Sequence, residues 1–189
     1  MIAIRKARSS DAIAIGAVHV AAWRSTYPGI LPDDYLAKMS VSRQAAHYDA
    51  AIRSGIGVLV ATASGPDVPS GSGSRIVGFT TAGRARTGDL GGRRLAEGEV
   101  ETLYVLDDWR ERGVGRHLIG AAAAHLVESG CKSAFLWVLR DNPSRWFYAR
   151  LGGKPAAESL VEVGGQAVSQ TAYVWSPLEK LEQATQTTS

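Results

Sequence analysis

The middle of this sequence contains an alternating apolar run that passes through a glycine-containing turn into an amphipathic run. β-Branched and aromatic residues alternate with other side chains over 97–105, a period of two that predicts a β-strand. Large apolar residues then recur every three or four positions over 115–129, which predicts a helix that ends at Gly130. Residues 110–115 form the turn between them. A strand that leads so directly into a helix favours an α/β fold.

A turn of this kind leaves backbone N–H groups unpaired at the start of the helix, with the positive end of the helix dipole behind them. Such a helix start binds anions. Gly113 and Gly115 lack the Cβ atoms that would hold a phosphate away from the backbone, and Arg110, Arg112 and Arg116 supply charged donors. Taken alone, the same residues also fit an ordinary surface turn with solvated arginines.

Two other glycine-rich phosphate motifs do not fit the turn. In a dinucleotide-binding G-x-G-x-x-G/A motif the last position would be Leu118, and no G-x-x-x-x-G-K-(S/T) sequence occurs. The turn instead resembles the acetyl-CoA motif of the GCN5-related N-acetyltransferase (GNAT) family, (Q/R)-x-x-G-x-(G/A). The segment from Arg110 to Gly115 matches this motif at every defined position.

A second signature of the GNAT family is an asparagine followed by a short helix that carries F-Y-x-x-L-G-F. Here Asn142 and residues 147–153, Phe-Tyr-Ala-Arg-Leu-Gly-Gly, are similar to it. Two positions depart from the pattern. Gly153 replaces the final Phe, and Asn142 precedes Tyr148 by six residues where the common pattern has seven. The resemblance covers residues 97–153 well and the flanking segments loosely.

Length and composition indicate one globular domain. The chain has 189 residues, of which 45% are apolar and 21% are charged. We assign the domain to residues 1–178 and expect 179–189, which show no core face, to form a disordered tail. No apolar run approaches the roughly 18 residues of a membrane span, and the first six residues follow a strand pattern rather than that of a signal peptide. We therefore expect a cytoplasmic protein that does not bind membranes.

Neither metals nor nucleic acids fit the residue pattern. Cys131 is the only cysteine, which excludes an intramolecular disulfide and a cysteine-based metal cluster. His117 and His125 lie eight residues apart, not the four that would place two metal ligands on one helix face. The net charge of +3 is mild, and no basic stripe is interleaved with aromatic residues. We expect no metal and no nucleic-acid partner.

The periodicities along the chain predict an α/β domain with a mixed sheet. Strands are expected at 1–6, 58–63, 76–82, 97–105, 134–139, 154–163 and 167–175, and helices from 11 to about 25 and at 33–39, 42–54, 115–129 and 144–150. Glycine-rich loops are expected at 64–74 and 83–96. This order also fits the GNAT fold, which is a mostly antiparallel sheet with helices on both faces and two splayed parallel central strands.

The resemblance implies where the cosubstrate acetyl-CoA lies. Its pantetheine would run between the splayed strands and bond the backbone at the end of the strand 97–105, since strand edges bind extended chains. A backbone N–H near Val105 would polarise the thioester oxygen. The implied cofactor-binding residues are Leu103, Tyr104, Val105, Arg110, Glu111, Arg112, Gly113, Val114, Gly115, Arg116 and Asn142.

Two catalytic residues follow from the same resemblance. Glu99 takes the place of the glutamate that opens the family's E-(I/V)-x-x-L-Y-V strand. It would remove a proton from the acceptor ammonium, whose reference pKa is about 10.4. Strand alternation places Glu97, Glu99 and Glu101 on one face, so the residues alone leave open which of them is the base. Tyr148 is similar to the tyrosine that protonates the departing sulfur in many members.

The resemblance also implies an acceptor pocket. Trp23 and Tyr27 lie in a segment broken by two prolines, at the place of the loop between the family's first two helices, and would line the pocket with Glu101. A packed aromatic corner is an equally open interpretation of these two residues.

The predicted function is that of an N-acetyltransferase. It would move an acetyl group from acetyl-CoA to a primary amine of a small molecule or peptide, by direct attack in a ternary complex. The alternative is a catalytically silent acyl-CoA-binding or sensing domain. A homodimer is compatible with either function.

Overall fold

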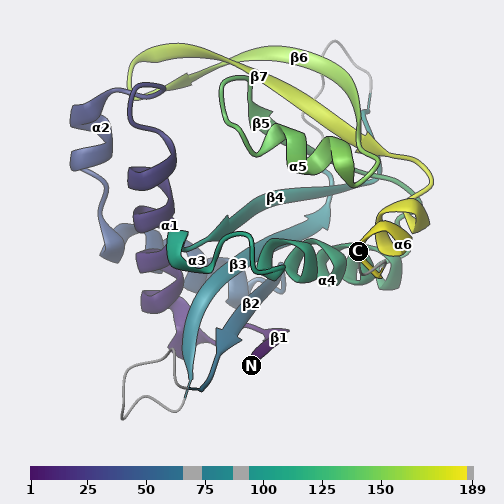
Figure 1. Cartoon of the computed structure of the whole chain (residues 1–189), viewed down its shortest axis with the longest axis horizontal. Coiled ribbons are helices and arrows are strands. Elements are labelled where there is room, and N and C mark those ends of the chain that lie inside the picture. Colours follow the sequence, from purple (N-terminus) through teal and green to yellow (C-terminus); the bar gives the residue numbers. More distant parts are fainter. Residues whose placement is uncertain (66–73, 87–93, 187–189) are drawn as a thin grey trace.

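The computed structural model describes residues 1–65, 74–86 and 94–186. It contains a seven-stranded sheet in the order β1-β2-β3-β4-β5-β7-β6, with helices on both faces (Figure 1). The strands are β1 (Ile2–Lys6), β2 (Gly57–Ala63), β3 (Arg75–Arg84), β4 (Gly98–Val105), β5 (Ala134–Leu139), β6 (Lys154–Val163) and β7 (Gln166–Trp175). The helices are α1 (Ala12–Thr26), α2 (Asp33–Ala37), α3 (Val41–Arg53), α4 (Val114–Glu128), α5 (Arg145–Arg150) and α6 (Glu179–Gln186), with 3-10 turns η1 (Ser9–Asp11) and η2 (Asp107–Trp109).

Neighbouring strands of the sheet are antiparallel except β4 and β5, which are parallel. The predicted fold class is thereby confirmed. Parallel strands need a crossover connection, and α4 supplies it because its apolar face covers the sheet. Leu118, Ile119, Ala122 and Leu126 of α4 are all fully buried.

The opposite face of the sheet is covered by α1 and α3. Ile15 of α1 and Tyr48 of α3 pack on Val60 and Phe79 of the neighbouring strands, and all four side chains are at most 1% exposed. The core therefore has two layers, one on each face of β2, β3 and β4. In the described part of the chain, no helix has the length and apolar character needed to cross a membrane.

The strand predicted at 97–105 is not regular. β4 begins one residue later, at Gly98, and pairs Thr102 with Thr81 but Val100 with Ala82, so that Glu101 is an extra residue in a β-bulge. A bulge breaks the period of two, so alternation alone does not decide the face on which Glu101 lies. β3 also extends two residues beyond the prediction, to Arg84. Most of the two expected glycine-rich loops lies outside the described residues.

The disordered tail expected at 179–189 is wrong for residues 179–186, which form α6 against α4. Leu178 and Leu181 are fully buried in the same core as α4, and Ala184 packs beside them. These residues are three apart and form a narrow apolar stripe on an otherwise polar helix. The stripe is stabilised by its packing partner and not by helix propensity, so the segment looks unstructured in isolation.

We expect Leu181→Ala to lower the free energy of unfolding by about 2–5 kcal/mol, because it empties a fully buried leucine site. Lys180→Ala, on the exposed side of the same helix, is the matched control and should change it little. Urea denaturation of both variants measures the difference. Equal, small effects would show that α6 is not packed in solution.

Candidate active site

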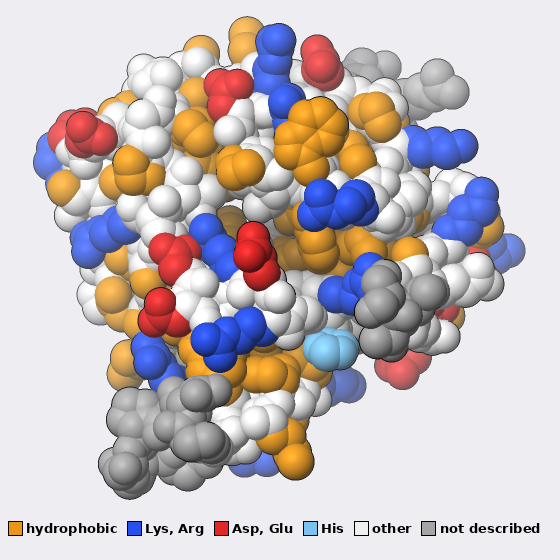
Figure 2. Space-filling view, viewed as in Figure 1, with side chains coloured by type: hydrophobic (Ala, Val, Ile, Leu, Met, Phe, Trp, Pro, Cys, Tyr) orange, Lys and Arg blue, Asp and Glu red, His pale blue; other side chains and the backbone are white. Residues whose placement is uncertain are grey.

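A cleft opens between the two parallel strands at the centre of the sheet. β4 and β5 pair at only two positions, Gly98 with Ala134 and Glu99 with Phe135, and diverge beyond them. Figure 1 shows β4 crossing the middle of the molecule with β5 and α5 separated from it. In the same view the surface is hollowed near its middle, with hydrophobic side chains at the bottom of the hollow and acidic and basic ones on its rim (Figure 2).

The side of β4 that faces this cleft is an unpaired strand edge. Leu106 N–H donates to Val77 O of β3 at 2.9 Å. Because alternate residues of a strand direct their backbone groups to opposite edges, Leu103 and Val105 turn theirs toward the cleft. The Val105 carbonyl accepts from Arg110 Nε at 3.4 Å, so the Val105 N–H and the Leu103 backbone groups are the ones that remain for an extended ligand.

The turn after β4 has the geometry of an anion site. Gly113, with a φ of 78°, is the N-cap of α4, and Glu111 has a φ of 59°. The helical hydrogen bonds begin with His117 N–H to Gly113 O, at 3.0 Å. The N–H groups of Gly113, Val114 and Gly115 donate to no atom of the described residues. They point out of the helix start, where an anion also meets the helix dipole.

The positive φ of Gly113 favours glycine at that position, but Gly115 has no such requirement. A Cβ built on Gly115 would lie 3.6 Å from Phe147 Cζ, an ordinary contact. The fold therefore tolerates a side chain at 115, and a ligand that approaches the backbone accounts better for the glycine. Arg116 follows on the first turn of α4 and is half-buried.

The arginines of the turn are engaged with the protein itself. Arg110 donates to Thr26 Oγ1 at 2.7 Å and pairs with Asp107 at 2.9 Å, so it joins the turn to the end of α1. The Arg112 guanidinium lies over the Trp109 ring, 5.1 Å from its centroid. The structure thus gives Arg110 a bracing role, and its contribution to binding a phosphate stays a prediction.

Asn142 is buried and crosses from the end of β5 to the end of α1. Its Nδ2 donates to Tyr27 Oη at 3.1 Å, and its Oδ1 accepts from Ser144 N–H at 2.9 Å. α5 begins at Arg145, so Asn142 lies in the turn before the helix and caps that turn. Its predicted contact with the cofactor is untested by this geometry.

Two buried tyrosines and a partly buried one come together at the open end of the cleft. Tyr27 follows α1, Tyr104 lies at the end of β4, and Tyr148 lies on α5. Burial raises the pKa of all three phenols, and the nearby Tyr27 raises the pKa of Tyr104 and Tyr148 further. Such mutual effects require hydroxyls that lie near one another. The structure therefore brings the predicted acid, Tyr148, together with Tyr27 and Tyr104.

The three glutamates differ in their surroundings. Glu97 lies before β4, and its carboxylate accepts the Lys132 N–H at 2.6 Å. Glu99 is half-buried, and its pKa is raised by burial and by Glu101, with Arg86 opposing the shift. Glu101 pairs with Arg86 at 3.6 Å. Glu99 is thus the carboxylate whose environment favours proton uptake, which is what a general base requires.

The sequence analysis missed an aromatic cluster behind the cleft, centred on His19. His19 Nδ1 lies 2.7 Å from Tyr48 Oη, and its ring stacks on Trp23 at 5.1 Å and meets the edge of Tyr104 at 5.0 Å. Burial, with a smaller effect of the nearby His47, lowers the pKa of His19 to about 4. The spacing of His19 and Trp23, four residues apart on α1, was the available signal. Trp23 packs as an aromatic corner, and its role in an acceptor pocket stays a prediction.

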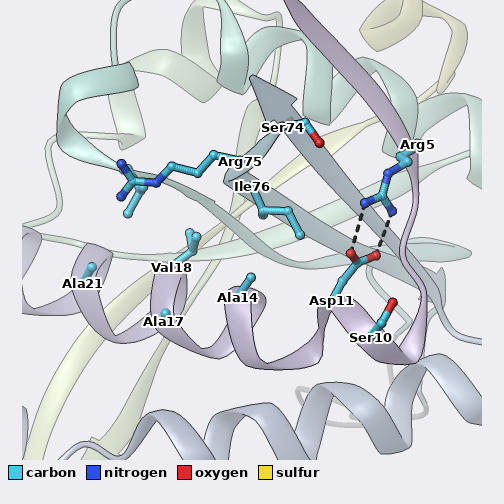
Figure 3. A pocket seen from close by; sticks show the side chains of 11 residues that line it. Arg5, Ser10, Asp11, Ala14, Ala17, Val18, Ala21, Ser74, Arg75 and Ile76 are labelled. Atoms are coloured by element: carbon cyan, nitrogen blue, oxygen red, sulfur yellow. Dashed lines mark hydrogen bonds and ion pairs between the residues drawn. The ribbon is translucent and has the colours of Figure 1, made fainter. Parts of the chain in front are cut away.

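A separate groove of about 660 Å³ runs between α1 and the start of β3 (Figure 3). Figure 3 shows Arg5 and Asp11 joined by two hydrogen bonds, at 2.7 and 3.0 Å, beside this groove. None of the predicted site residues lines it. Within the described residues, no three His, Cys, Asp or Glu side chains are grouped so that they could hold a metal ion.

Comparison with known proteins identifies the family. The family model described as "Acetyltransferase (GNAT) family" matches residues 22–153. An uncharacterized N-acetyltransferase of Bacillus subtilis, YuaI, is 31% identical over 182 residues, which are 96% of this chain and 97% of that protein. Fold, site and sequence thus agree on one class of enzyme, the acyltransferases. The chain belongs to the GNAT family.

Solved structures share the fold. A GCN5-related N-acetyltransferase from Rhodopseudomonas palustris superposes with a TM-score of 0.67 at 22% identity, covering 92% of this chain and 94% of that one. The acetyltransferase yncA from Salmonella typhimurium, solved with its cofactor acetyl-CoA, has a TM-score of 0.63 at 19% identity and covers 93% of each chain. Enzymes of this family use acetyl-CoA and an acceptor substrate.

The lowered pKa of His19 predicts a pH-dependent stability. Between pH 6.5 and about 4 the unfolded chain binds a proton at His19 that the folded chain does not, so stability falls as the pH falls. From pH 7 to pH 5 the wild type should lose about 2 kcal/mol more than His19→Phe, as measured by urea unfolding. An equal loss in both proteins would show that His19 titrates normally.

Proposed function

We propose that this protein transfers the acetyl group of acetyl-CoA to a primary amine of a small molecule or peptide, by direct attack in a ternary complex. One observation carries the proposal. The unpaired edge of β4 leads, within a few residues, to a helix start whose N–H groups at Gly113, Val114 and Gly115 are unused. An extended chain that ends in a pyrophosphate fits both features together.

The residues present fit acetyl-CoA. The pyrophosphate would bind the N–H groups at the start of α4, with Gly115 leaving the backbone accessible. Leu103 and Val105 would bond the pantetheine from the strand edge. Arg112 and Arg116 lie on the same turn and add positive charge. When bound, acetyl-CoA supplies the activated acyl group.

Glu99 would act as the general base, directly or through a water molecule. Burial and the neighbouring Glu101 raise its pKa, which increases the tendency of the carboxylate to take up a proton. Glu101, beside it, adds negative charge that favours an ammonium group. Glu97 is bound to the Lys132 backbone and is the poorest of the three candidates.

Tyr148 would protonate the departing sulfur from its buried position on α5. The polarising N–H at Val105 lies on the cleft edge of β4, at the end nearest the anion site. Glu99 lies where β4 still pairs with β5, and Tyr148 lies near Tyr27, so the acyl carbon would be held between them.

The anion site can be tested by calorimetry of coenzyme A binding. Gly115→Asp should lower the affinity at least about tenfold, because it places a like charge against the pyrophosphate. Gly115→Ala is the matched comparison: its Cβ has room in the fold and carries no charge, so any smaller loss that it causes measures the steric effect of a Cβ alone. Wild-type affinity in the Asp variant would place the pyrophosphate elsewhere.

The base can be tested by following thiol release from acetyl-CoA with a panel of amines. Glu99→Gln should lower kcat/KM by roughly 10²–10⁴, with a loss that shrinks as pH rises and more of the amine is already deprotonated. Glu97→Gln is the control and should retain most of the activity. The opposite ranking would contradict the assignment of Glu99. A wild type that binds acetyl-CoA but acetylates no amine would support a silent acyl-CoA-binding domain instead.

A further inference from the structure

We propose that Tyr27 is a second catalytic acid, which shares with Tyr148 the protonation of the departing sulfur. The proposal rests on the acyl transfer proposed above and adds a reacting group that lies outside the strand and helix motifs. Tyr27 comes from the segment after α1, on the other side of the cleft from α5. The sulfur would therefore leave between two phenol hydroxyls.

The backbone holds Tyr27 in a fixed place relative to the anion site. Its N–H donates to Trp23 O at 3.0 Å and closes the end of α1. The preceding residue, Thr26, accepts from Arg110 at 2.7 Å. Arg110 belongs to the turn that carries the anion site, so a ligand bound to that turn and the Tyr27 side chain are positioned by the same contacts.

The Tyr27 hydroxyl is oriented by a hydrogen bond that leaves its own proton available. Its oxygen accepts a hydrogen bond from Asn142 Nδ2 at 3.1 Å. A phenol has one proton to donate, and no atom of the described residues accepts the proton of Tyr27. The side chain is only 7% exposed, so an unused donor there is costly unless a ligand accepts from it. The departing sulfur is the acceptor that this arrangement fits.

Electrostatics makes Tyr27 the better acid of the two. Burial raises the pKa of Tyr27, but the Asn142 hydrogen bond and the Arg110 charge both act to lower it. For Tyr148, burial and the nearby Tyr27 both raise the pKa, with no opposing contribution. Ionisation of both phenols at the same time has a high electrostatic cost. Only one of them therefore gives its proton to the sulfur in each turnover.

The proton balance of the step is complete. The amine nitrogen forms a bond to the carbonyl carbon, and the C–S bond breaks with its electron pair going to sulfur. Tyr27 or Tyr148 gives its O–H proton to that sulfur. The ammonium substrate loses two protons on becoming an amide, one of which restores the phenol through solvent while the other is released by way of Glu99.

The test compares kcat for Tyr27→Phe, Tyr148→Phe and the double variant with acetyl-CoA. Each single variant keeps one donor and should lose about tenfold or less, whereas the double variant should lose roughly 10²–10⁴. Tyr35→Phe is the matched control, because Tyr35 lies near Trp23 but does not raise the pKa of the other phenols. Coenzyme A affinity and thermal unfolding should stay near wild type in the Phe variants.

A second donor substrate separates acid catalysis from a structural effect. In an acetyl thioester of an aromatic thiol, the leaving group is a stable thiolate that needs no proton. The losses of kcat in the Phe variants should therefore disappear with this substrate. Losses of equal size with both thioesters, or a double variant no slower than Tyr148→Phe, would overturn the role of Tyr27.

Asn142→Asp gives an independent measurement if Tyr27→Phe unfolds. It keeps an oxygen for Ser144 N–H and removes the donor to Tyr27, so kcat should fall with acetyl-CoA and recover with the aromatic thioester. If kcat does not recover with the aromatic thioester, the result counts against the proposal. A wild type that releases thiol with no amine would overturn the proposed function and this proposal together, whereas normal wild-type turnover with unaffected Tyr27 variants would overturn this proposal alone.

Discussion

The limited pairing of β4 with β5 is the constraint on which the rest of this molecule depends. Two residue pairs join the strands, and a core shared by both halves of the sheet closes the narrow end, where Val100 and Ala134 pack together under α4. At the open end the Asn142–Tyr27 hydrogen bond connects the two halves again. The cleft is therefore held at both ends by side chains, and the strand edge between them is left without a partner.

The same arrangement explains why the proposed anion site is preorganised. Positive φ angles at Glu111 and Gly113 aim the start of α4 outward, and Arg110 fixes this turn to α1. A ligand need not order these groups when it binds, so less of its interaction energy is lost to conformational entropy. The arginine that matches the family motif thus contributes by holding the turn in shape.

Local patterns predicted most of the fold before the structure did, and the proposed anion site comes from the same patterns. The strand, turn and helix of 97–129 are read from the period of the apolar residues and from two glycines, all within a short span. The bulge at Glu101, the buried stripe of α6, and the partners of Arg110, Asn142 and His19 depend on residues far away in sequence. No periodicity within one segment encodes such contacts, because a tertiary partner decides each of them.

Burial acts on the proposed base and on the proposed acids in the same direction but with opposite consequences. It disfavours the charged form, so it raises the pKa of Glu99 toward the working pH and makes this carboxylate a better base. It also raises the pKa of the phenols away from that pH and makes them weaker acids. A cleft dry enough to activate Glu99 therefore requires a compensating contact on the acid side. Asn142 and Arg110 provide this contact at Tyr27 and not at Tyr148, which is the physical reason for a second phenol at the open end of the cleft.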